Sequence, residues 1–508
     1  MSKKDFLGYN FRQKRIFLFF AFFVSILTLI LTLCCSPAKV DLEARIQRIE
    51  NGLVPEPGIV IKGQAPQRMA LSDRMELYKV PGVSIAVIND FKIEWAKGYG
   101  VKEAGGNDPV TTETFFQAAS ISKPVSAFAT LYFVEQGLLD LDEDVNRRLV
   151  SWEVPENEFT KEKKVTLRGI MSHNAGLTVH GFGGYAQGKE VPSLLQILDG
   201  EKPANSASIC VDIKPGSKYR YSGGGYTVMQ QLLIDVLGKP FPDIMRETVL
   251  DKIGMINSTY EQPLPESLEV HAARAHRING NMIKGKWHAY PEMAAAGLWT
   301  KPSDLCRFAI EIMLSRAGKS NKVLSQEMVK NMLTDQNENV GLGLFLWDEG
   351  EDFRFMHGGS NEGFKCTLVA YPEKGQGAAI MTNGDYGGML NSEILRSLSA
   401  EYGWKHFRQT EKKMAKVNPE IYDVYTGTYQ LTPGRKLTVS REGSHLFADP
   451  IQVIPTAYVK CEIFPESENI FFMTQTDQKI TFTRDKEGKV TGLILEQRGR
   501  KRKATKLD

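Results

Sequence analysis

The sequence predicts an α/β or α+β sandwich followed by a small antiparallel β-barrel or sandwich, in a chain of 508 residues. Residues 83–88 and 92–97 are β-type runs joined by Asn89 and Asp90, which is a hairpin signal. An apolar segment with helical spacing follows at Val125–Leu138. Strands beside a buried helix predict the sandwich, and short β-type runs after residue 420 predict the barrel.

The composition is that of an ordinary globular chain. Hydrophobic residues make up 42% of it, so a large core is possible, and the formal net charge is only +3. A chain of this length typically folds into about three domains. Because no strongly basic surface is indicated, we expect no nucleic-acid partner.

The N-terminal segment predicts export. Residues 1–15 are basic, and Ile16–Leu33 contains no charged residue. As a helix that run spans roughly 27 Å, close to the thickness of a bilayer core. It ends at Cys34 and Cys35, which resembles a bacterial lipoprotein signal, although a small residue is expected before the cysteine. A lipoprotein, a plain signal and an uncleaved anchor all remain open. Each places the rest of the chain outside the cytoplasm, in the cell envelope.

Residues 36–64 read as a tether. Leu42, Ile46 and Ile49 repeat at helical spacing, and a similar short repeat covers 71–78. Prolines interrupt the region between the two repeats. The cysteines beyond the N-terminal segment form no C-x-x-C pair, so we expect no metal site. Export would permit disulfides, but the spacing does not say which cysteines would pair. These are Cys210, Cys306, Cys366 and Cys461.

Ser120 and Lys123 form the first chemical stretch. Residues three apart lie on one face of a helix, so the lysine amine can lie beside the serine hydroxyl if a helix begins at Ser120. Pro124 is acceptable only near such a start. The apolar residues that follow predict a buried helix with the serine at its N-terminal end. There the helix dipole favours a developing negative charge.

Tyr221 lies in the second stretch, Pro215–Gly225. Its glycines allow a sharp turn that presents the tyrosine to a cleft, and we expect a helix over Tyr226–Leu237. His173 is interpreted as a satisfied turn histidine without a chemical role. The remaining histidines of this region lack metal-ligand spacing: His180, His271, His276 and His288.

The third stretch is Arg354–Tyr371. It begins as a strand, passes through Gly358 and Gly359, and resumes as a strand at Phe364. The glycine pair would let a substrate backbone approach the strand edge. The alternative is a plain β-bulge with His357 in solvent. A loop at 294–304, leading into a capped helix, is expected to pack near the floor of the cleft.

The C-terminal part changes character. Residues 406–420 are charged and read as a linker, and Arg498–Lys503 reads as a solvated basic tail. Between them the predicted strands are Tyr425–Tyr429, Lys436–Ser440, Ile470–Thr474, Ile480–Arg484 and Val490–Leu495.

Taken in order, the three stretches resemble the motifs of the penicillin-recognising serine hydrolases, which include class C β-lactamases, DD-peptidases and related esterases and aminopeptidases. The family pattern is S-x-x-K, Y-x-N and K-T-G. The resemblance implies an α+β domain, with an all-α lobe beside an antiparallel sheet and flanking helices. The resulting scheme has a signal or anchor at 1–35, a tether at 36–64, the hydrolase domain at 65–405, a linker at 406–420 and a lipocalin-like β domain at 421–508.

The resemblance also implies roles. Ser120 attacks a carbonyl group, and Lys123 and Tyr221 take its proton. A lysine ammonium favours the phenolate of a neighbouring tyrosine, and burial lowers the pKa of a lysine. The backbone N–H groups of Ser120 and Ser360 hold the oxyanion, and the substrate-binding edge comprises His357, Gly358, Gly359 and Ser360. No cofactor or metal is implied. The expected partners are a small-molecule or peptide substrate and, through the N-terminal segment, a membrane.

Two departures from the family pattern bear on activity. Gly223 replaces the asparagine of Y-x-N, and His357 replaces the lysine of K-T-G. A histidine can still donate to a substrate carboxylate, but its charge depends on pH. We therefore expect a peptidase or esterase with weak or no β-lactamase activity. The alternatives are a slowly deacylating sensor or binding protein and an inactive scaffold. An α/β-hydrolase would need a G-x-S-x-G elbow, which the sequence lacks.

Overall fold

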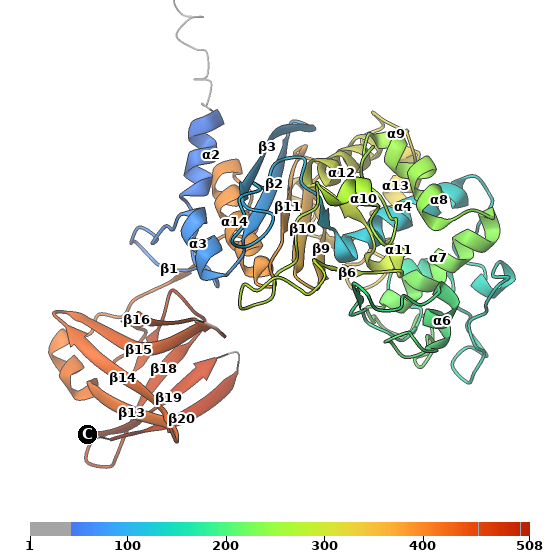
Figure 1. Ribbon diagram of the computed structural model, residues 1–508. Helices are drawn as coiled ribbons and strands as arrows, with labels where there is room; N and C mark the ends of the chain where they lie inside the picture. Colours follow the sequence, from blue (N-terminus) through green and yellow to red (C-terminus); the bar gives the residue numbers. More distant parts are fainter. Residues whose placement is uncertain (1–41, 456, 498, 508) are drawn as a thin grey trace, which may run out of the picture. The chain divides into compact units, whose positions relative to one another are not determined.

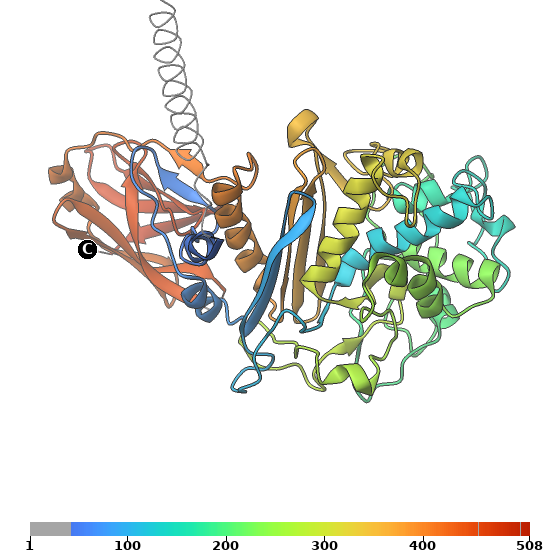
Figure 2. The ribbon, with the colours of Figure 1, turned by 90° about the horizontal axis from the view of Figure 1, so that it is seen from above.

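The computed structural model describes residues 42–455, 457–497 and 499–507 (Figures 1 and 2). The chain divides into two compact units, residues 1–50 and 51–508, and the described part of the first is helix α2 (Leu42–Glu50). The apolar run 16–33 with its two following cysteines, on which the predicted signal or anchor depends, lies outside the described residues. In the part of the chain that is described, no helix has the length and apolar character to cross a bilayer.

A six-stranded antiparallel sheet with the order β3-β2-β11-β10-β9-β8 carries the first large domain. The predicted hairpin at 83–97 is confirmed as β2 and β3. Helices α12 and α14 cover opposite faces of this sheet (Figures 1 and 2), so β2 is apolar and buried along almost its whole length. The bounds are β2 (Gly82–Asn89), β3 (Lys92–Gly100), β8 (Phe345–Trp347), β9 (Arg354–Asn361), β10 (Phe364–Tyr371), β11 (Gln376–Thr382), α12 (Pro302–Arg316) and α14 (Gly387–Tyr402).

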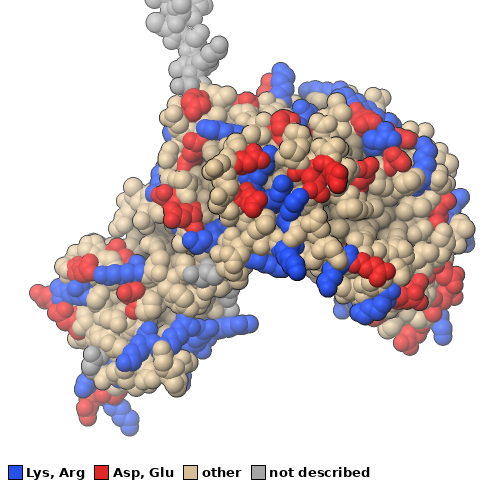
Figure 3. Space-filling view, viewed as in Figure 1, with Lys and Arg blue, Asp and Glu red and all other residues tan. Residues whose placement is uncertain are grey.

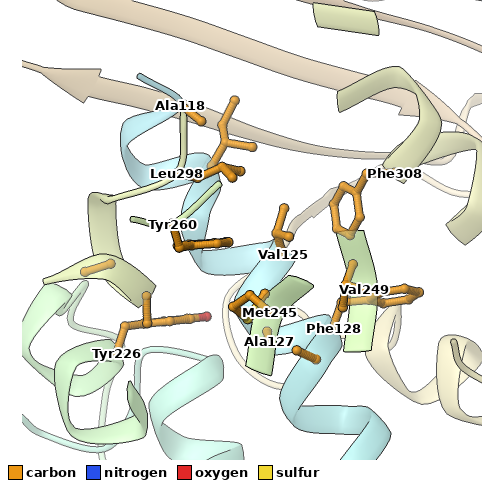
Figure 4. Close-up of a cluster of buried hydrophobic side chains, with 14 of the residues drawn as sticks. Ala118, Val125, Ala127, Phe128, Tyr226, Met245, Val249, Tyr260, Leu298 and Phe308 are labelled. Carbon is orange, nitrogen blue, oxygen red and sulfur yellow. The ribbon is translucent and has the colours of Figure 1, made fainter. Parts of the chain in front are cut away.

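A mainly helical lobe is inserted between β3 and β8. Its central helix is α4 (Ser122–Glu135), which is buried through most of its length, as its apolar composition predicts. Phe128 of α4 meets Phe308 of α12 edge to face at 5.4 Å between ring centroids (Figure 4). The other helices are α5 (Leu167–Met171), α6 (Leu194–Asp199), α7 (Gly223–Leu237), α8 (Phe241–Met245), the π-helix η3 (Arg246–Leu250), α9 (Asp251–Ile253), α10 (Glu266–Glu269), α11 (Met293–Ala296) and α13 (Gln326–Met332).

Several short elements complete this domain. Helix α3 covers Leu71–Leu77, as the repeat at 71–78 predicts. The two-stranded pairs are β4 (Phe116–Gln117) with β7 (Trp299–Thr300), and β5 (Tyr185–Ala186) with β6 (His288–Ala289). The 3-10 turns of this domain are η1 (Ala119–Ile121), η2 (Val145–Arg147) and η4 (Gly350–Asp352), while η5 (Pro419–Tyr425) packs its tyrosines into the core of the C-terminal domain.

The predicted linker at 406–420 contains a strand. Strand β12 (Thr410–Lys412) lies within it and pairs in parallel with β1 (Ile59–Ile61), a strand that was not predicted in the tether. Ile59, Val60 and Ile61 are all buried. The pairing uses backbone groups of β12, so its polar side chains gave no signal of a strand.

The C-terminal domain is a closed antiparallel barrel, as predicted. It has eight strands, of which β15, β16 and β20 were not among the predicted runs. The prediction of a solvated tail at 498–503 is wrong, because β20 pairs with both β19 and β13 and closes the barrel. In β20 only Ala504 is buried while its basic side chains point outward, so backbone pairing holds a strand that lacks apolar alternation. The strands are β13 (Gly427–Thr432), β14 (Arg435–Glu442), β15 (His445–Ile454), β16 (Ala457–Pro465), β17 (Ile470–Phe472), β18 (Lys479–Arg484), β19 (Val490–Gln497) and β20 (Arg500–Lys506).

Charged residues of both signs are interspersed over the face that Figure 3 shows. The described cysteines are Cys210, Cys306, Cys366 and Cys461, and all are free thiols. A search of the described residues finds no cluster of three or more His, Cys, Asp or Glu that is able to hold a metal ion.

Candidate active site

Ser120 lies on a 3-10 turn, two residues before the first residue of the α-helix, and not at the helix start that the spacing predicts. The turn covers Ala119–Ile121, and α4 begins at Ser122. Ala119 has a φ of 49°, a left-handed conformation that is uncommon for alanine. Ser122 fixes this turn: its hydroxyl donates to the Ala119 carbonyl at 2.6 Å and accepts from the Leu298 N–H at 3.0 Å. The strained turn is therefore held from two sides, which is common at functional sites.

Lys123 lies beside the Ser120 hydroxyl, as the three-residue spacing predicts. Its Nζ is 3.1 Å from Ser120 Oγ and donates to the Ala295 carbonyl at 2.8 Å. The side chain is buried, and burial lowers the pKa of the ammonium to about 7. At neutral pH a large share of Lys123 is therefore a free amine whose lone pair can accept a proton.

The segment 293–298 positions a catalytic candidate as well as packing near the cleft floor. Its Ala295 carbonyl orients Lys123, and hydrogen bonds to α4 and α7 hold the segment in place. Ser126 of α4 donates to the Ala294 carbonyl at 2.9 Å, and the Ala294 N–H donates to Gln230 of α7 at 3.0 Å. The sequence gave no sign of this role, because a backbone carbonyl has no residue signature.

Tyr221 completes the group around the serine. Its phenol is hydrogen-bonded to Ser120, and Lys123 Nζ lies 5.0 Å from the centroid of its ring. Burial raises the pKa of this phenol well above its ordinary value, and the hydrogen bond from Ser120 offsets the effect only in part. The expectation that the lysine favours a phenolate is not met in this geometry, so Tyr221 is a protonated phenol and a potential proton donor.

His173 holds the segment that carries Tyr221. Its carbonyl accepts from the Arg220 N–H at 2.7 Å, and its Nδ1 accepts from the Ser222 N–H at 3.2 Å. It occupies a turn with a φ of 57°, as predicted, but its ring also packs on Tyr221 with 4.2 Å between centroids. Sequence reasoning missed this placement, since a turn histidine and one that supports a neighbouring motif look alike in one sequence.

The three glycines after Tyr221 do not form the predicted sharp turn. Gly223, Gly224 and Gly225 form the first turn of α7, with Ser222 as the N-cap. Because these glycines have no side chain, neighbouring segments can pack closely against the start of α7. A Cβ on Gly224 would lie 2.6 Å from the Thr178 carbonyl oxygen, and one on Gly223 would lie 3.1 Å from the Phe182 ring. The space that the family asparagine would need at Gly223 is therefore partly filled by the 180–182 loop.

Strand β9 runs through the glycine pair without a register shift, so the β-bulge alternative is wrong. Gly359 faces the serine turn, where a Cβ would lie 2.2 Å from the Ala118 oxygen and 2.3 Å from Cys366 Sγ. Asn361 and Phe364 close the hairpin to β10. Since narrow and wide pairs alternate in an antiparallel ladder, Ser360 directs its backbone N–H away from β10. Strand β8 pairs no further along β9 than Met356, so this edge is open at Ser360.

His357 is buried, so the alternative of a solvated side chain is also wrong. Its Nδ1 lies 2.7 Å from the Gly358 carbonyl oxygen. Burial, reinforced by the nearby Lys123 charge, lowers the pKa of this imidazole to about 3. His357 is therefore neutral at physiological pH and is not a cationic substitute for the family lysine.

Ser120, Lys123, Tyr221 and His357 all line one cleft of about 1460 Å³. Ser206, Ser208 and Phe345 also line it, from segments that the sequence did not single out. Every residue that the sequence predicts for the site lies on its wall: Ser120, Lys123, Tyr221, His357, Gly358, Gly359 and Ser360.

Comparison with protein families gives two matches. A family described as Beta-lactamase matches residues 68–399. A domain of unknown function (DUF3471) matches residues 411–506, the region that holds the eight-stranded barrel.

Individual relatives agree with this. A penicillin-binding protein of Bacillus subtilis is 21% identical over 78% of this chain and 89% of its own. Penicillin-binding protein 4 of Amycolatopsis lactamdurans is 24% identical over 70% of this chain and 95% of its own. Among solved structures, an octameric penicillin-binding protein homologue from Pyrococcus abyssi aligns with a TM-score of 0.59 and 21% identity, over 86% of this chain and 98% of its own. The D-amino acid amidase of Ochrobactrum anthropi aligns with a TM-score of 0.54 and 20% identity, over 65% and 98%.

Proposed function

We propose that this chain, which belongs to the β-lactamase family of serine hydrolases, cleaves an amide or ester through an acyl-enzyme on Ser120. The observation that carries the proposal is the position of Lys123 Nζ, which lies 3.1 Å from the Ser120 hydroxyl in a buried setting. A serine needs a base in hydrogen-bond reach to act as a nucleophile at neutral pH. An amine with a pKa of about 7 meets that need.

The acylation step follows from the protonation states. Lys123, as the free amine, takes the hydroxyl proton while Ser120 Oγ attacks the substrate carbonyl carbon. Tyr221, kept as a phenol by burial, donates its proton to the leaving amine or alkoxide. The Lys123 ammonium then returns a proton to the phenolate. Water releases the acyl group by the reverse sequence of proton transfers.

Charge on the tetrahedral intermediate is held by two backbone N–H groups in this proposal, those of Ser120 and Ser360. The open edge of β9 supports the second assignment, because the Ser360 N–H is not used by β10 or β8. One such donor is typically worth about 2.7–4 kcal/mol of barrier. Gly359 lets the serine turn and this edge approach each other.

The substrate class that we propose is a peptide, amide or ester, with weak or no turnover of β-lactams. Two features favour this choice over a dedicated β-lactamase: the glycine at position 223 and the neutral histidine at position 357. Relatives described as penicillin-binding proteins and an amidase support amide substrates.

The test is a panel of p-nitrophenyl esters, D-amino-acid amides and D-Ala-D-Ala peptides against wild type and Ser120→Ala. Multiple turnover that is lost in Ser120→Ala supports the hydrolase. A burst of one product per chain, followed by no further release, would instead favour the slowly deacylating sensor. If neither turnover nor a burst is observed, the protein is an inactive scaffold.

We also propose that the protein is exported and held at the cell envelope by its N-terminal segment. The support is the basic stretch 1–15, the uncharged run 16–33 and the pair Cys34 and Cys35. Cell fractionation with metabolic labelling by a radioactive fatty acid tests this. Label that is lost when both cysteines are changed to serine supports a lipoprotein, whereas membrane association without label supports an anchor.

A further inference from the structure

The hydrogen bond of His357 fixes the tautomer of its ring. Nδ1 lies 2.7 Å from the Gly358 carbonyl oxygen. A carbonyl oxygen can only accept, so Nδ1 carries the proton. In the neutral ring Nε2 is then a bare lone pair, which accepts hydrogen bonds and cannot donate one.

This acceptor has no partner among the residues that the structure describes. His357 is 2% exposed, and its Nε2 makes no hydrogen bond to the described residues. The rings of Phe345 and Tyr221 lie near the His357 ring, at 5.2 and 6.4 Å between centroids. An unpaired buried acceptor is costly. Because His357 lines the cleft, a ligand that enters the cleft can supply the missing donor.

The cations of the cleft are already engaged. The Lys and Arg residues on its wall are Lys123, Arg220 and Lys365. Lys123 contacts the Ser120 hydroxyl and the Ala295 carbonyl. Arg220 pairs with Asp212 and donates to the Gly176 carbonyl at 2.6 Å, while Lys365 pairs with Asp385 at 2.9 Å. Among the described residues of this wall, each lysine and arginine thus already contacts a carboxylate or an uncharged oxygen of the protein, although the buried Nε of Arg220 has no hydrogen-bond partner.

We propose that His357 selects substrates whose leaving group presents a neutral N–H donor, such as a carboxamide, over substrates that present a free carboxylate there. A carboxylate would place acceptor against acceptor at Nε2, whereas a carboxamide N–H supplies the donor that is missing. The inference rests on the proposed function, since it concerns the substrate of the same acyl-enzyme reaction.

The groups around His357 keep its ring neutral. They are Lys123 on α4, His173 on the loop after α5, and Tyr221 ahead of α7, together with the uncharged ring of Phe345, while His180 packs on Tyr221. Burial and the Lys123 charge both disfavour an imidazolium. Because Lys123 gains its charge below about pH 7, we expect the preference to be constant between about pH 8 and pH 9, where both groups are neutral.

A matched pair of esters tests the inference: 3-carbamoylphenyl phenylacetate and 3-carboxyphenyl phenylacetate. Wild type is expected to favour the carbamoyl ester at least about tenfold in kcat/KM, and His357→Lys is expected to reverse the preference. His271→Lys, the same change at an exposed histidine, should keep the wild-type ratio. A wild-type ratio at or below one, or an unchanged ratio in an active His357→Lys enzyme, overturns the inference.

A different set of results would contradict the proposed function itself. If Ser120→Ala hydrolyses both esters like wild type, or if wild type hydrolyses neither, the serine mechanism is wrong, and the inference falls with it. A second readout does not need turnover. Nitrogen-15 NMR of histidine-labelled protein at pH 7, with His357→Gln to assign the signal, should show a protonated Nδ1 and a bare Nε2. A proton on Nε2 overturns the inference.

Discussion

The His173 ring packs against the Tyr221 ring with 4.2 Å between centroids, while its Nδ1 accepts the N–H of the next residue, Ser222. One side chain thus fixes both the ring and the backbone of the proposed proton donor. Burial and the nearby Lys123 charge hold the pKa of the His173 imidazole well below its usual value. The neutral acceptor at Nδ1 is therefore available at every pH at which the enzyme is assayed.

His173→Phe should lower kcat without a comparable change in KM. The phenyl ring keeps the packing on Tyr221 but leaves the Ser222 N–H buried without an acceptor. That loss costs about 1–3 kcal/mol, or roughly ten- to a hundredfold in kcat if it appears as misplacement of Tyr221. Steady-state ester hydrolysis measures it, with exposed His271→Phe as the control. A normal kcat in folded His173→Phe would show that Tyr221 needs no such support.

The pH dependence of activity should report Lys123. Burial lowers its pKa to about 7, and the amine is the active form, so kcat/KM for a neutral ester should rise through about pH 7 to a plateau. His357, with a pKa of about 3, should add no inflection above pH 5. In Lys123→Arg the rise of kcat/KM through pH 7 should disappear together with most of the activity, because a guanidinium stays protonated. A wild-type profile that is flat from pH 5 to 9 would contradict the assignment.

Lys123 should also destabilise the fold in acid. Its folded pKa of about 7 lies below the unfolded value of about 10.4. Between these values the unfolded chain binds more protons, so this group makes stability rise with pH, and below pH 7 its full penalty is present. Lys123→Met should therefore raise the free energy of unfolding most at pH 6 and least near pH 10. Denaturant titrations at the two values measure this, and an equal gain at both would contradict it.

Gly359→Ala should damage both stability and activity. Its Cβ would lie 2.2 Å from the Ala118 oxygen and 2.3 Å from Cys366 Sγ, so the serine turn must move. Overpacking of this kind costs about 1–3 kcal/mol. Gly358→Ala is the matched control for the melting temperature, because the nearest atom to its Cβ is 3.8 Å away. Equal melting temperatures for the two variants would show that the serine turn has room to shift.

Gly223→Asn should not create a β-lactamase by itself. The side chain would meet the Phe182 ring and the His180 carbonyl within about 3.2 Å of its first carbon. We expect little cephalosporin hydrolysis from the wild type or from Gly223→Asn, followed by absorbance, with any gain requiring Phe182→Ala in addition. A wild type that hydrolyses cephalosporins with a high kcat/KM would contradict the proposed substrate class.

The sequence predicts the catalytic neighbourhood because its chemistry depends on side chains at fixed local spacing. Ser120 and Lys123 are three residues apart, and Tyr221 and His357 were found by their order in a family pattern. The contributions of Ala295 and Ser122 were not predictable, since they act through a backbone carbonyl and a local hydroxyl contact. His173 was recognised as a turn residue, but its packing on Tyr221 depends on contacts between segments about fifty residues apart.

Two of the errors in the fold share one cause. Strands β12 and β20 are held by backbone pairing, and their side chains are polar or basic, so a period-two apolar pattern was absent. The glycines after Tyr221 were expected to form a sharp turn, and those in β9 either to let a substrate backbone approach or to form a bulge. In the structure they permit close contact with the Thr178 carbonyl and the Ala118 turn. A single sequence does not separate these two uses of glycine.

Intact-mass spectrometry after reaction with a fluorophosphonate or an ampicillin-type penicillin tests the central claim most directly. Wild type should gain one covalent adduct, which peptide mapping locates to Ser120, and Ser120→Ala should gain none while remaining folded. An adduct of equal size on Ser120→Ala, or one mapped to another residue of the wild type, would contradict the assignment of Ser120 as the nucleophile.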